Sequence, residues 1–502
     1  MSRRRVKDTV FCGVGETKTR RGRVSLITLD RNTYLSFLIF MQFRSLRPEL
    51  ADTVRLSLPI VIAQLGVVLM GVTDNIFVGR LLGAVPLGAA GLANSLSFLV
   101  LSIGIGGLSV VSALVARANG QGDKAAINQL FRASLRVAML FSLVFGGVSA
   151  GVGWYFEWFR QTPEVTQMGR EFMLILSVST LPLLIFVAAR QLADGLRQPR
   201  VAMTITMTAL AINALFNYLL ITGTGPFPRL GLNGSATATL ISRIFMAVAM
   251  LAYVYRSRLF RPFLQVAYNQ LPTTNQVRDI MRLGLPGGLT FFFEIAAFSI
   301  AAIMIGWLGA TELGAHQIAI NMASTTYMIA TGISTAGAIR VGNAVGMGDV
   351  MRIRRSGIAA FLLATAFMVL CSLLFFTANN FLVSLYIRDS PEVAQLAASL
   401  VIVAGFFQLS DGIQVVGIGT LRGLSDVNVP TWITLFAYWG MSLPLGYWLA
   451  FPLKMGAVGV WLGLLIGLTI AAVLLTYRFF RLANRYRATA SDSAIVPASV
   501  ST

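Results

Sequence analysis

Twelve long apolar stretches dominate the sequence, and each is long enough to cross a lipid bilayer as a helix. A spanning helix needs about 20 mostly apolar residues, because the hydrocarbon core of a bilayer is roughly 30 Å thick. The stretches lie at residues 56–79, 92–114, 134–153, 172–190, 203–222, 235–254, 285–306, 318–340, 357–377, 397–418, 431–452 and 457–477. We therefore expect an all-α polytopic membrane protein with twelve transmembrane helices.

The composition argues against a water-soluble protein. Charged residues make up 12% of the chain, against about 25% in soluble domains. The net charge of +20 comes from basic residues near the start and between the apolar stretches, so we expect a lipid bilayer and no nucleic acid as partner. Two cysteines, Cys12 and Cys371, provide neither a disulfide framework nor a metal-site spacing. We expect Cys371 to be a packing residue.

The basic residues also predict the orientation. Lys and Arg in alternate gaps between the apolar stretches number 24 in one set and 6 in the other. Cytoplasmic loops carry the excess of Lys and Arg, so we expect both termini in the cytoplasm. Two cytoplasmic termini require an even number of spans, which agrees with twelve. The expected location is the inner (plasma) membrane of the cell.

The chain contains an internal repeat. The triplet Leu-Gly-Ala at 82–84 recurs at 308–310, and the pair Gly-Asp at 122–123 recurs at 348–349, both 226 residues later. Six spans are thus followed by six similar spans. Because six is even, the two halves enter the membrane from the same side, and their pseudo-two-fold axis runs along the membrane normal. Two such halves can rock about a central cleft, and a duplication without transport is the alternative.

The repeat suggests where the parts of the chain begin and end. The expected parts are a disordered basic leader at 1–47, a first six-helix half at 48–270, a second six-helix half at 271–482 and a disordered cytoplasmic tail at 483–502. The apolar run at 34–41 is only eight residues long, too short to span a membrane. A sharper hypothesis is that translation starts natively at Met41.

Three acidic residues lie deep in apolar stretches: Asp74, Glu294 and Asp411. An ionised carboxylate at the bilayer centre costs roughly 2.5–3.5 kcal/mol on insertion scales, so these side chains are expected to face a cavity. Apolar neighbours disfavour the charged form of a carboxyl group, which suits a proton carrier near neutral pH. The alternative for each is a carboxylate satisfied by hydrogen bonds between helices.

A sodium ion is the other coupling ion that the residues allow. Asn213 and Asn217 are four residues apart, so they share one helix face, and with Asp74 they offer several oxygen ligands. The alternative for both asparagines is hydrogen bonding between helices. We expect no other metal and no cofactor, and the coupling ion is H⁺ or Na⁺.

Aromatic and amide side chains near the acids suggest a substrate cavity. Aromatic faces attract cations, so carboxylates among them suit a lipophilic cation, although ordinary packing of Phe in a membrane is the alternative. The candidate cavity residues are Phe291, Phe292, Phe293, Phe407, Gln408 and Gln414.

Several motifs are similar to those of a known family. They lie at residues 71–75 (Gly-Val-Thr-Asp-Asn), 313–321 (Leu-Gly-Ala-His-Gln-Ile-Ala-Ile-Asn), 340–346 (Arg-Val-Gly-Asn-Ala-Val-Gly), 407–414 (Phe-Gln-Leu-Ser-Asp-Gly-Ile-Gln) and 421–423 (Leu-Arg-Gly). With them the chain resembles the multidrug and toxic compound extrusion (MATE) transporters, and within these the NorM-like branch, over roughly residues 48–480.

The resemblance implies a cation-coupled antiporter, not an enzyme, that exports lipophilic and often cationic drugs or metabolites, and we expect a monomer. Acids matching Asp74, Glu294 and Asp411 are implicated in cation coupling in the NorM-like branch. His316 also lies in a family motif, and we expect it to have a structural role. The related DinF-like branch has a second Asp in the fifth span, whereas this chain has asparagines there, which favours Glu294 and Asp411 as the coupling residues.

Two other functions compete with efflux. A flippase for a lipid-linked oligosaccharide belongs to the same superfamily, but it needs several basic residues in its cleft, and Arg243 is the one clear cation within a predicted span. A membrane-embedded lipid-modifying enzyme needs clustered acids or a nucleophile with a base, and the loops offer neither. No P-loop pattern occurs in the sequence, so ATP is not expected as a direct energy source.

Overall fold

The computed structural model describes residues 31–265, 274–387 and 390–493, and these residues form helices and connecting turns without a strand. The long helices of the first half are α1 (Arg31–Leu82), α2 (Ala84–Leu108), α3 (Val110–Gln121), α4 (Lys124–Trp154), α5 (Pro163–Gly195), α6 (Pro199–Thr222) and α7 (Leu232–Arg256). Those of the second half are α9 (Thr274–Gly306), α10 (Ala310–Gly346), α11 (Val350–Thr377), α13 (Pro391–Gly423), α14 (Asn428–Leu435), α15 (Leu443–Ala450) and α16 (Gly456–Ser493). Short helices are α8 (Arg261–Leu264) and α12 (Asn379–Ser384), with the 3₁₀-helix η1 (Phe156–Phe159) and the π-helix η2 (Phe436–Ser442).

These elements confirm the predicted all-α fold and the position of every expected span. Within the described residues, ten helices are long and apolar enough to cross a membrane by themselves, with α2 and α3 together forming one of them. The two remaining spans are α10, which is rich in Ser, Thr, Asn and Gln, and the segment from α14 through η2 to α15, which is divided into short pieces. The two halves thus contribute six spans each.

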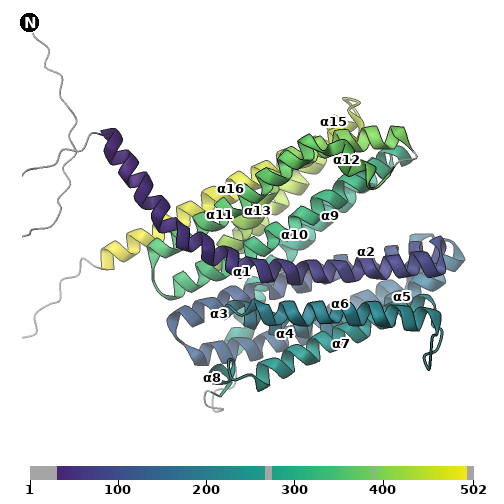
Figure 1. The fold of residues 1–502 in the computed structure, drawn as a ribbon, viewed down its shortest axis with the longest axis horizontal. Helices are drawn as coiled ribbons and strands as arrows, with labels where there is room; N and C mark the ends of the chain where they lie inside the picture. Colours follow the sequence, from purple (N-terminus) through teal and green to yellow (C-terminus); the bar gives the residue numbers. More distant parts are fainter. Residues whose placement is uncertain (1–30, 266–273, 388–389, 494–502) are drawn as a thin grey trace, which may run out of the picture.

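The helices form two bundles (Figure 1). One bundle holds α2 to α7 and the other holds α9 to α16, while α1 packs on helices of both. The bundles meet at the end where α1, α3 and α10 cross, and they diverge toward the opposite end. Small residues allow the close approach of helices within a membrane. A Cβ atom on Gly346 of α10 would collide with the Arg117 carbonyl oxygen of α3, and one on Gly342 would lie 2.7 Å from the Ala113 carbonyl oxygen.

The repeated Gly-Asp pair has the same geometry in both halves. Gly122 directly follows α3 and Gly348 lies two residues after α10. Both are in the left-handed region, with φ of 73° and 69°, where glycine has no steric penalty. Asp123 and Asp349 then cap the next helix, and each carboxylate accepts a hydrogen bond of 2.9 Å from the backbone N–H three residues later. The repeat in the sequence is therefore a repeat in local structure.

The structure differs from the expected part boundaries at both ends. Helix α1 begins at Arg31 and α16 continues to Ser493, whereas 1–47 and 483–502 were expected to be disordered. The stretches 31–47 and 468–493 contain neither Gly nor Pro, so nothing local interrupts either helix. The expected boundary at 270 lies outside the described residues.

Candidate functional site

A cavity of about 350 Å³ lies in the second half, between α9, α10 and α13. Its walls are mostly apolar and aromatic, with polar groups at a few positions. The lining residues are Phe98 of α2, Phe291, Glu294, Ile295, Phe298, Ser299 and Ala302 of α9, His316, Gln317, Ile320, Ala323, Ser324, Tyr327 and Met328 of α10, and Phe407 and Asp411 of α13. An apolar pocket with a few converging polar groups is the usual form of a small-molecule site.

Two carboxyl groups line this cavity. Glu294 is 5% exposed and Asp411 is 2% exposed, so both are removed from water. The Tyr438 hydroxyl lies 3.4 Å from Oε1 of Glu294 and donates to it, and the Tyr327 hydroxyl is a second hydrogen-bond donor to the same carboxylate. No ion pair to either acid occurs in the described part of the chain. Without a cationic partner, a buried carboxyl group is most stable when it holds a proton or binds a cation.

The tyrosines come from α10 and η2, and no sequence motif places them beside these acids. Tyr438 lies in η2, a π-helical segment of seven residues. Pro444 has no N–H to offer the Gly440 carbonyl, which favours irregular helix geometry here. Short π-helical segments occur often at functional sites. A proline inside an apolar stretch that also holds Tyr438 was the signal that sequence reasoning missed.

Asp74 lies in a separate polar cluster in the first half. Its Oδ1 accepts hydrogen bonds from Nδ2 of Asn213 at 3.0 Å and of Asn217 at 2.6 Å, and its Oδ2 accepts one from the Thr239 hydroxyl at 2.8 Å. All four side chains are buried. The structure thus brings Asp74, Asn213 and Asn217 together as predicted, and adds Thr239 from α7.

The Asp74 cluster differs electrostatically from the second-half cavity. Arg243 lies one helical turn after Thr239 on α7, donates to the Ser179 hydroxyl at 2.6 Å, and interacts electrostatically with Asp74. Asp74 therefore has a nearby cation, whereas Glu294 and Asp411 have none in the described chain. The amide oxygens of Asn213 and Asn217 are buried without a partner, so they remain available as ligands. Carboxylate, amide and hydroxyl oxygens are the ligands that a hard cation prefers.

The structure divides the predicted cavity residues into two groups. Phe291 and Phe407 line the cavity. Phe292, Phe293, Gln408 and Gln414 are not among its lining residues.

The residues outside the cavity have other surroundings. Phe292 and Phe293 pack edge to face, and the Phe293 ring contacts Trp439, whose Nε1 donates to the Phe293 carbonyl at 3.1 Å. Gln408 is buried and accepts a hydrogen bond of 2.8 Å from Thr326. Gln414 is buried, with both polar atoms of its side chain unpartnered. Besides Phe291 and Phe407, the apolar walls of the cavity include Phe98, Phe298 and further residues of α9 and α10.

His316, expected to be structural, is buried against an aromatic residue and also lines the cavity. Its Nδ1 accepts a hydrogen bond of 3.2 Å from Nε1 of Trp461, and the two rings meet edge to face with centroids 5.8 Å apart. Trp461 is itself fully buried. The histidine therefore holds α10 against α16 at the side of the cavity.

Comparisons with known proteins agree with this architecture. The profile of the MatE family matches residues 59–219 and 286–448, one block in each half. The chain is 35% identical over 446 residues to the probable multidrug resistance protein NorM of Rhizobium meliloti, covering 87% of this chain and 94% of that protein. It is 36% identical over 440 residues to the multidrug resistance protein NorM of Burkholderia vietnamiensis, with 87% and 94% covered.

Solved structures share the fold at lower sequence identity. A eukaryotic MATE transporter superposes with a TM-score of 0.80 at 19% identity, covering 88% of this chain and 99% of that one. A multidrug resistance MATE family transporter in an outward-facing conformation superposes with a TM-score of 0.78 at 18% identity, covering 88% and 97%. The twelve-helix, two-lobed architecture is thus common to this chain and to both.

Proposed function

Because the chain belongs to the MatE family, whose members are transporters rather than enzymes, we propose that it exports lipophilic, often cationic small molecules by cation-coupled antiport. Family membership excludes the membrane-embedded enzyme considered from the sequence. The chain is a multi-pass plasma-membrane protein. Its relatives are named for multidrug resistance, which supports drugs or toxic metabolites as the exported molecules. The two halves that form the transport path lie in one chain, so a monomer is the proposed unit.

The pairing of Glu294 and Asp411 in one aromatic cavity carries this proposal. Both carboxyl groups are buried, and both line the same 350 Å³ space. Neither has a cationic partner within the described residues. A coupling ion and a cationic substrate would therefore compete for the same negative charge. That competition is the differential affinity that antiport requires.

The orientation of the chain connects this competition to export. The bundles meet at the end where α1, α3 and α10 cross, and the loops of this end carry most of the basic residues. We place this end, and both termini, in the cytoplasm. The conformation is then outward-facing. Binding of the ion from outside lowers the affinity for the substrate, and the ion-loaded protein returns to the inward-facing state.

The three acids divide into two sites with different surrounding groups. Glu294 and Asp411, surrounded by aromatic and apolar groups, suit protons. Asp74 with Asn213, Asn217 and Thr239 provides several oxygens, which suits either a proton or Na⁺. One pH unit supplies about 1.4 kcal/mol per proton, and 100 mV supplies about 2.3 kcal/mol per net charge moved. Exchange of one H⁺ for one monovalent cation draws only on the ion gradient.

Efflux of a fluorescent lipophilic cation from proteoliposomes tests the proposal. The full-length protein would be compared with Asp411→Asn, Asp74→Asn and the control Glu157→Gln, whose side chain is exposed in η1. A pH gradient and a Na⁺ gradient would be imposed separately. We expect gradient-driven efflux by the wild-type protein and the control, and loss of efflux in Asp411→Asn. Equal efflux with and without both gradients would rule out antiport.

The flippase of the same superfamily remains the competing function. A pyrophosphate-bearing lipid requires basic groups in the cavity, but the residues that line the 350 Å³ cavity include two acids and neither Lys nor Arg. The geometry therefore favours a cationic cargo. In the same proteoliposomes, translocation of a labelled lipid-linked oligosaccharide without cation efflux would reverse this assignment.

A further inference from the structure

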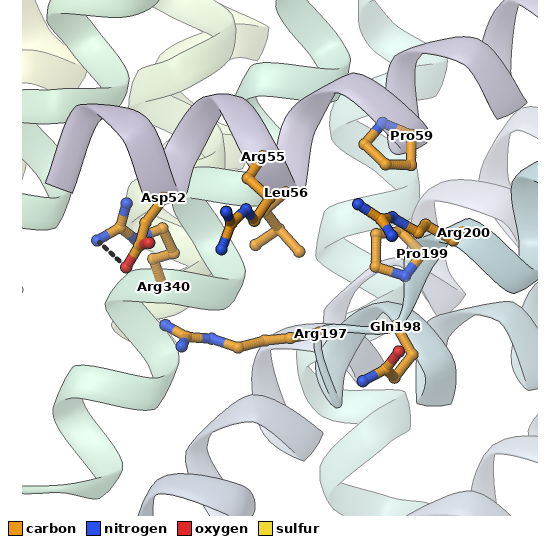
Figure 2. A pocket seen from close by; sticks show the side chains of 9 residues that line it. All are labelled: Asp52, Arg55, Leu56, Pro59, Arg197, Gln198, Pro199, Arg200 and Arg340. Carbon is orange, nitrogen blue, oxygen red and sulfur yellow. Dashed lines mark ion pairs between the residues drawn. The ribbon is translucent and has the colours of Figure 1, made fainter. Parts of the chain in front are cut away.

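A second cavity, of about 510 Å³, lies at the end of the molecule where the bundles meet. It is lined by residues 52–59 in the middle of α1, by the turn between α5 and α6 with the start of α6, and by Arg340 of α10 (Figure 2). Its volume falls within the ~300–1,000 Å³ that is typical of small-molecule sites. The two halves of the chain both contribute to its wall, because α10 belongs to the second half. None of the three membrane-embedded acids lines it.

Arginine side chains dominate this cavity. Arg55, Arg197 and Arg200 extend into the space between α1 and the α5–α6 turn (Figure 2). In the described part of the chain none of the three forms an ion pair or a side-chain hydrogen bond. The fourth arginine, Arg340, differs because it is fully buried and bonded to Glu49 and Thr53. Three guanidinium groups thus face one cavity, with Asp52 as its only lining carboxylate.

Arg197 is held in place by its backbone. It has φ of 62°, a left-handed conformation that a residue with a side chain adopts only when its surroundings require it. Its N–H donates to the Asp194 carbonyl at 2.9 Å at the end of α5. The Nε atom is buried and has no hydrogen-bond partner. Burial, followed by the positive charge of Arg352, lowers the pKa of Arg197, and Asp52 opposes this effect. An anion at Nε would satisfy both the donor and the charge.

The first turn of α6 also favours an anion in this cavity. Helix α6 is 24 residues long, begins with Pro199, and has no side-chain hydrogen bond from its N-cap residue, Gln198. The N–H groups of the first turn of a helix and its dipole both favour an anion. Gln198, Pro199 and Arg200 all line the cavity, so the free helix end and the three arginines face one space.

The surroundings indicate that the anion belongs to a lipid. Arg55 precedes the first predicted span by one residue, and Arg200 lies in the first turn of α6, so the cavity is at the level of the membrane interface. On α1, Val54 is 43% exposed and Leu58 is 57% exposed. Apolar side chains exposed at this level are suited to contact with acyl chains. Basic groups at the interface attract anionic head groups.

We propose that the cavity formed by Arg55, Arg197, Arg200 and the start of α6 binds a phosphate group, that of an anionic phospholipid at the membrane interface. Arg340 and Asp52 form its wall on the side of the second half. A head group held there contacts both halves, so it stabilises the conformation in which the bundles meet at this end. The proposal does not depend on antiport, because none of its residues lies in the efflux cavity.

Native mass spectrometry of the full-length protein tests this site. The protein in detergent would be exposed to phosphatidylglycerol and, separately, to phosphatidylcholine. The double variant Arg197→Gln/Arg200→Gln would be compared with Arg354→Gln, an exposed arginine at the same end of the molecule that does not line the cavity. One interfacial arginine changes anionic-lipid affinity about fivefold, so the double variant should bind phosphatidylglycerol about 30-fold more weakly. The control variant should bind it like the wild type.

A second experiment, with a water-soluble phosphate compound, distinguishes the source of the phosphate. If glycerol 3-phosphate raises the melting temperature of the wild-type protein and not of the double variant, while phosphatidylglycerol is not retained, the site binds phosphate from a soluble compound. Two results would overturn the proposal if glycerol 3-phosphate also has no effect. One is equal retention of phosphatidylglycerol and phosphatidylcholine by the wild-type protein. The other is full retention of phosphatidylglycerol by the double variant. Should the double variant fail to fold, Arg197→Lys replaces it, because a lysine keeps the charge and loses the fixed Nε donor.

Discussion

The hydroxyl group of Tyr438 lies 3.4 Å from Oε1 of Glu294 and joins a π-helical segment of the eleventh span to the acid of the seventh. The distance is at the long end for a hydrogen bond, so this contact contributes to the orientation of the carboxyl group but does not fix it alone. Tyr327 donates to the same group from α10. Glu294 is thus hydrogen-bonded to two neighbouring helices, so a change in its charge alters its bonds to both.

Removal of the Tyr438 hydroxyl should weaken transport without abolishing it. A neutral hydrogen bond contributes about 0.5–1.5 kcal/mol, so Tyr438→Phe should lower gradient-driven efflux by about two- to tenfold. The ring keeps its edge-to-face contact with Phe298, so the fold should be preserved. The measurement is the initial rate of dye efflux at equal protein incorporation. A rate indistinguishable from that of wild type would show that Tyr327 alone orients Glu294.

Substitutions at the two cavity acids should not be additive. Glu294 and Asp411 line one cavity and interact electrostatically, so removal of either should disable the same ion site. The efflux rate of the double variant Glu294→Gln/Asp411→Asn should therefore be no lower than that of the slower single variant.

Asp74 provides the comparison for this pair of substitutions. It lies in a separate cluster, bonded to α6 and α7, so combining Asp74→Asn with Glu294→Gln should multiply the separate losses. Efflux rates of the three single variants and the two double variants decide between these outcomes. Additive losses at Glu294 and Asp411 would mean that the two acids bind different ions.

Loss of a donor to Asp74 should destabilise the first half. The Asn217 amide donates to Oδ1 of Asp74 at 2.6 Å inside the membrane. Asn217→Leu leaves a buried carboxylate with fewer donors, which should lower the unfolding free energy by about 1–3 kcal/mol. Thr208→Val on the exposed face of α6 is the matched control, because Thr208 bonds only to its own helix. Thermal unfolding in detergent measures both, and an unchanged melting temperature for Asn217→Leu would mean that Asp74 is protonated in the resting protein.

The ion pair between Arg340 and Glu49 should anchor α1 to the second half. Arg340 is fully buried in α10 and bonds to the Glu49 carboxylate and to the Thr53 hydroxyl on α1. Removing one partner of a buried pair costs about 3–5 kcal/mol, so Glu49→Ala should strongly destabilise the fold. Glu157→Gln, on exposed η1, should leave the melting temperature unchanged. A small effect of Glu49→Ala would indicate that Asp52, 3.9 Å from Arg340, replaces Glu49.

The fold could be predicted from the sequence to a greater extent than the sites. Apolar length fixes each span because the bilayer sets the length, and the paired Gly-Asp caps at 122–123 and 348–349 are local signals. The grouping of Glu294 with Asp411, and of Asp74 with Thr239, depends on which helices pack together, and no local pattern specifies that. The basic cavity escaped prediction for the same reason, since Arg55 and Arg197 are separated by most of the first half. Helical structure at 31–47 and 483–493 differs from the expectation because polar, basic composition is also typical of disordered segments.

The contact between α3 and α10 offers a direct test of alternating access. Gly346 meets the Arg117 carbonyl of α3, and a Cβ atom there would collide with backbone, so a large side chain cannot be accommodated while the bundles meet at this end. Gly346→Leu should shift the protein toward the conformation that is open at this end, and it should lower efflux. Gly147→Leu on α4 is the control, because a Cβ atom on Gly147 has nothing within 4 Å.

Spin labels at Gln121 and Met351, both exposed, would report the separation of α3 from the start of α11 in a background with Cys12 and Cys371 changed to Ser. We expect the distance distribution of Gly346→Leu to lengthen relative to the wild type and Gly147→Leu. An unchanged distribution in a folded but inactive Gly346→Leu would show that this contact is needed for transport without acting as the closure between the halves.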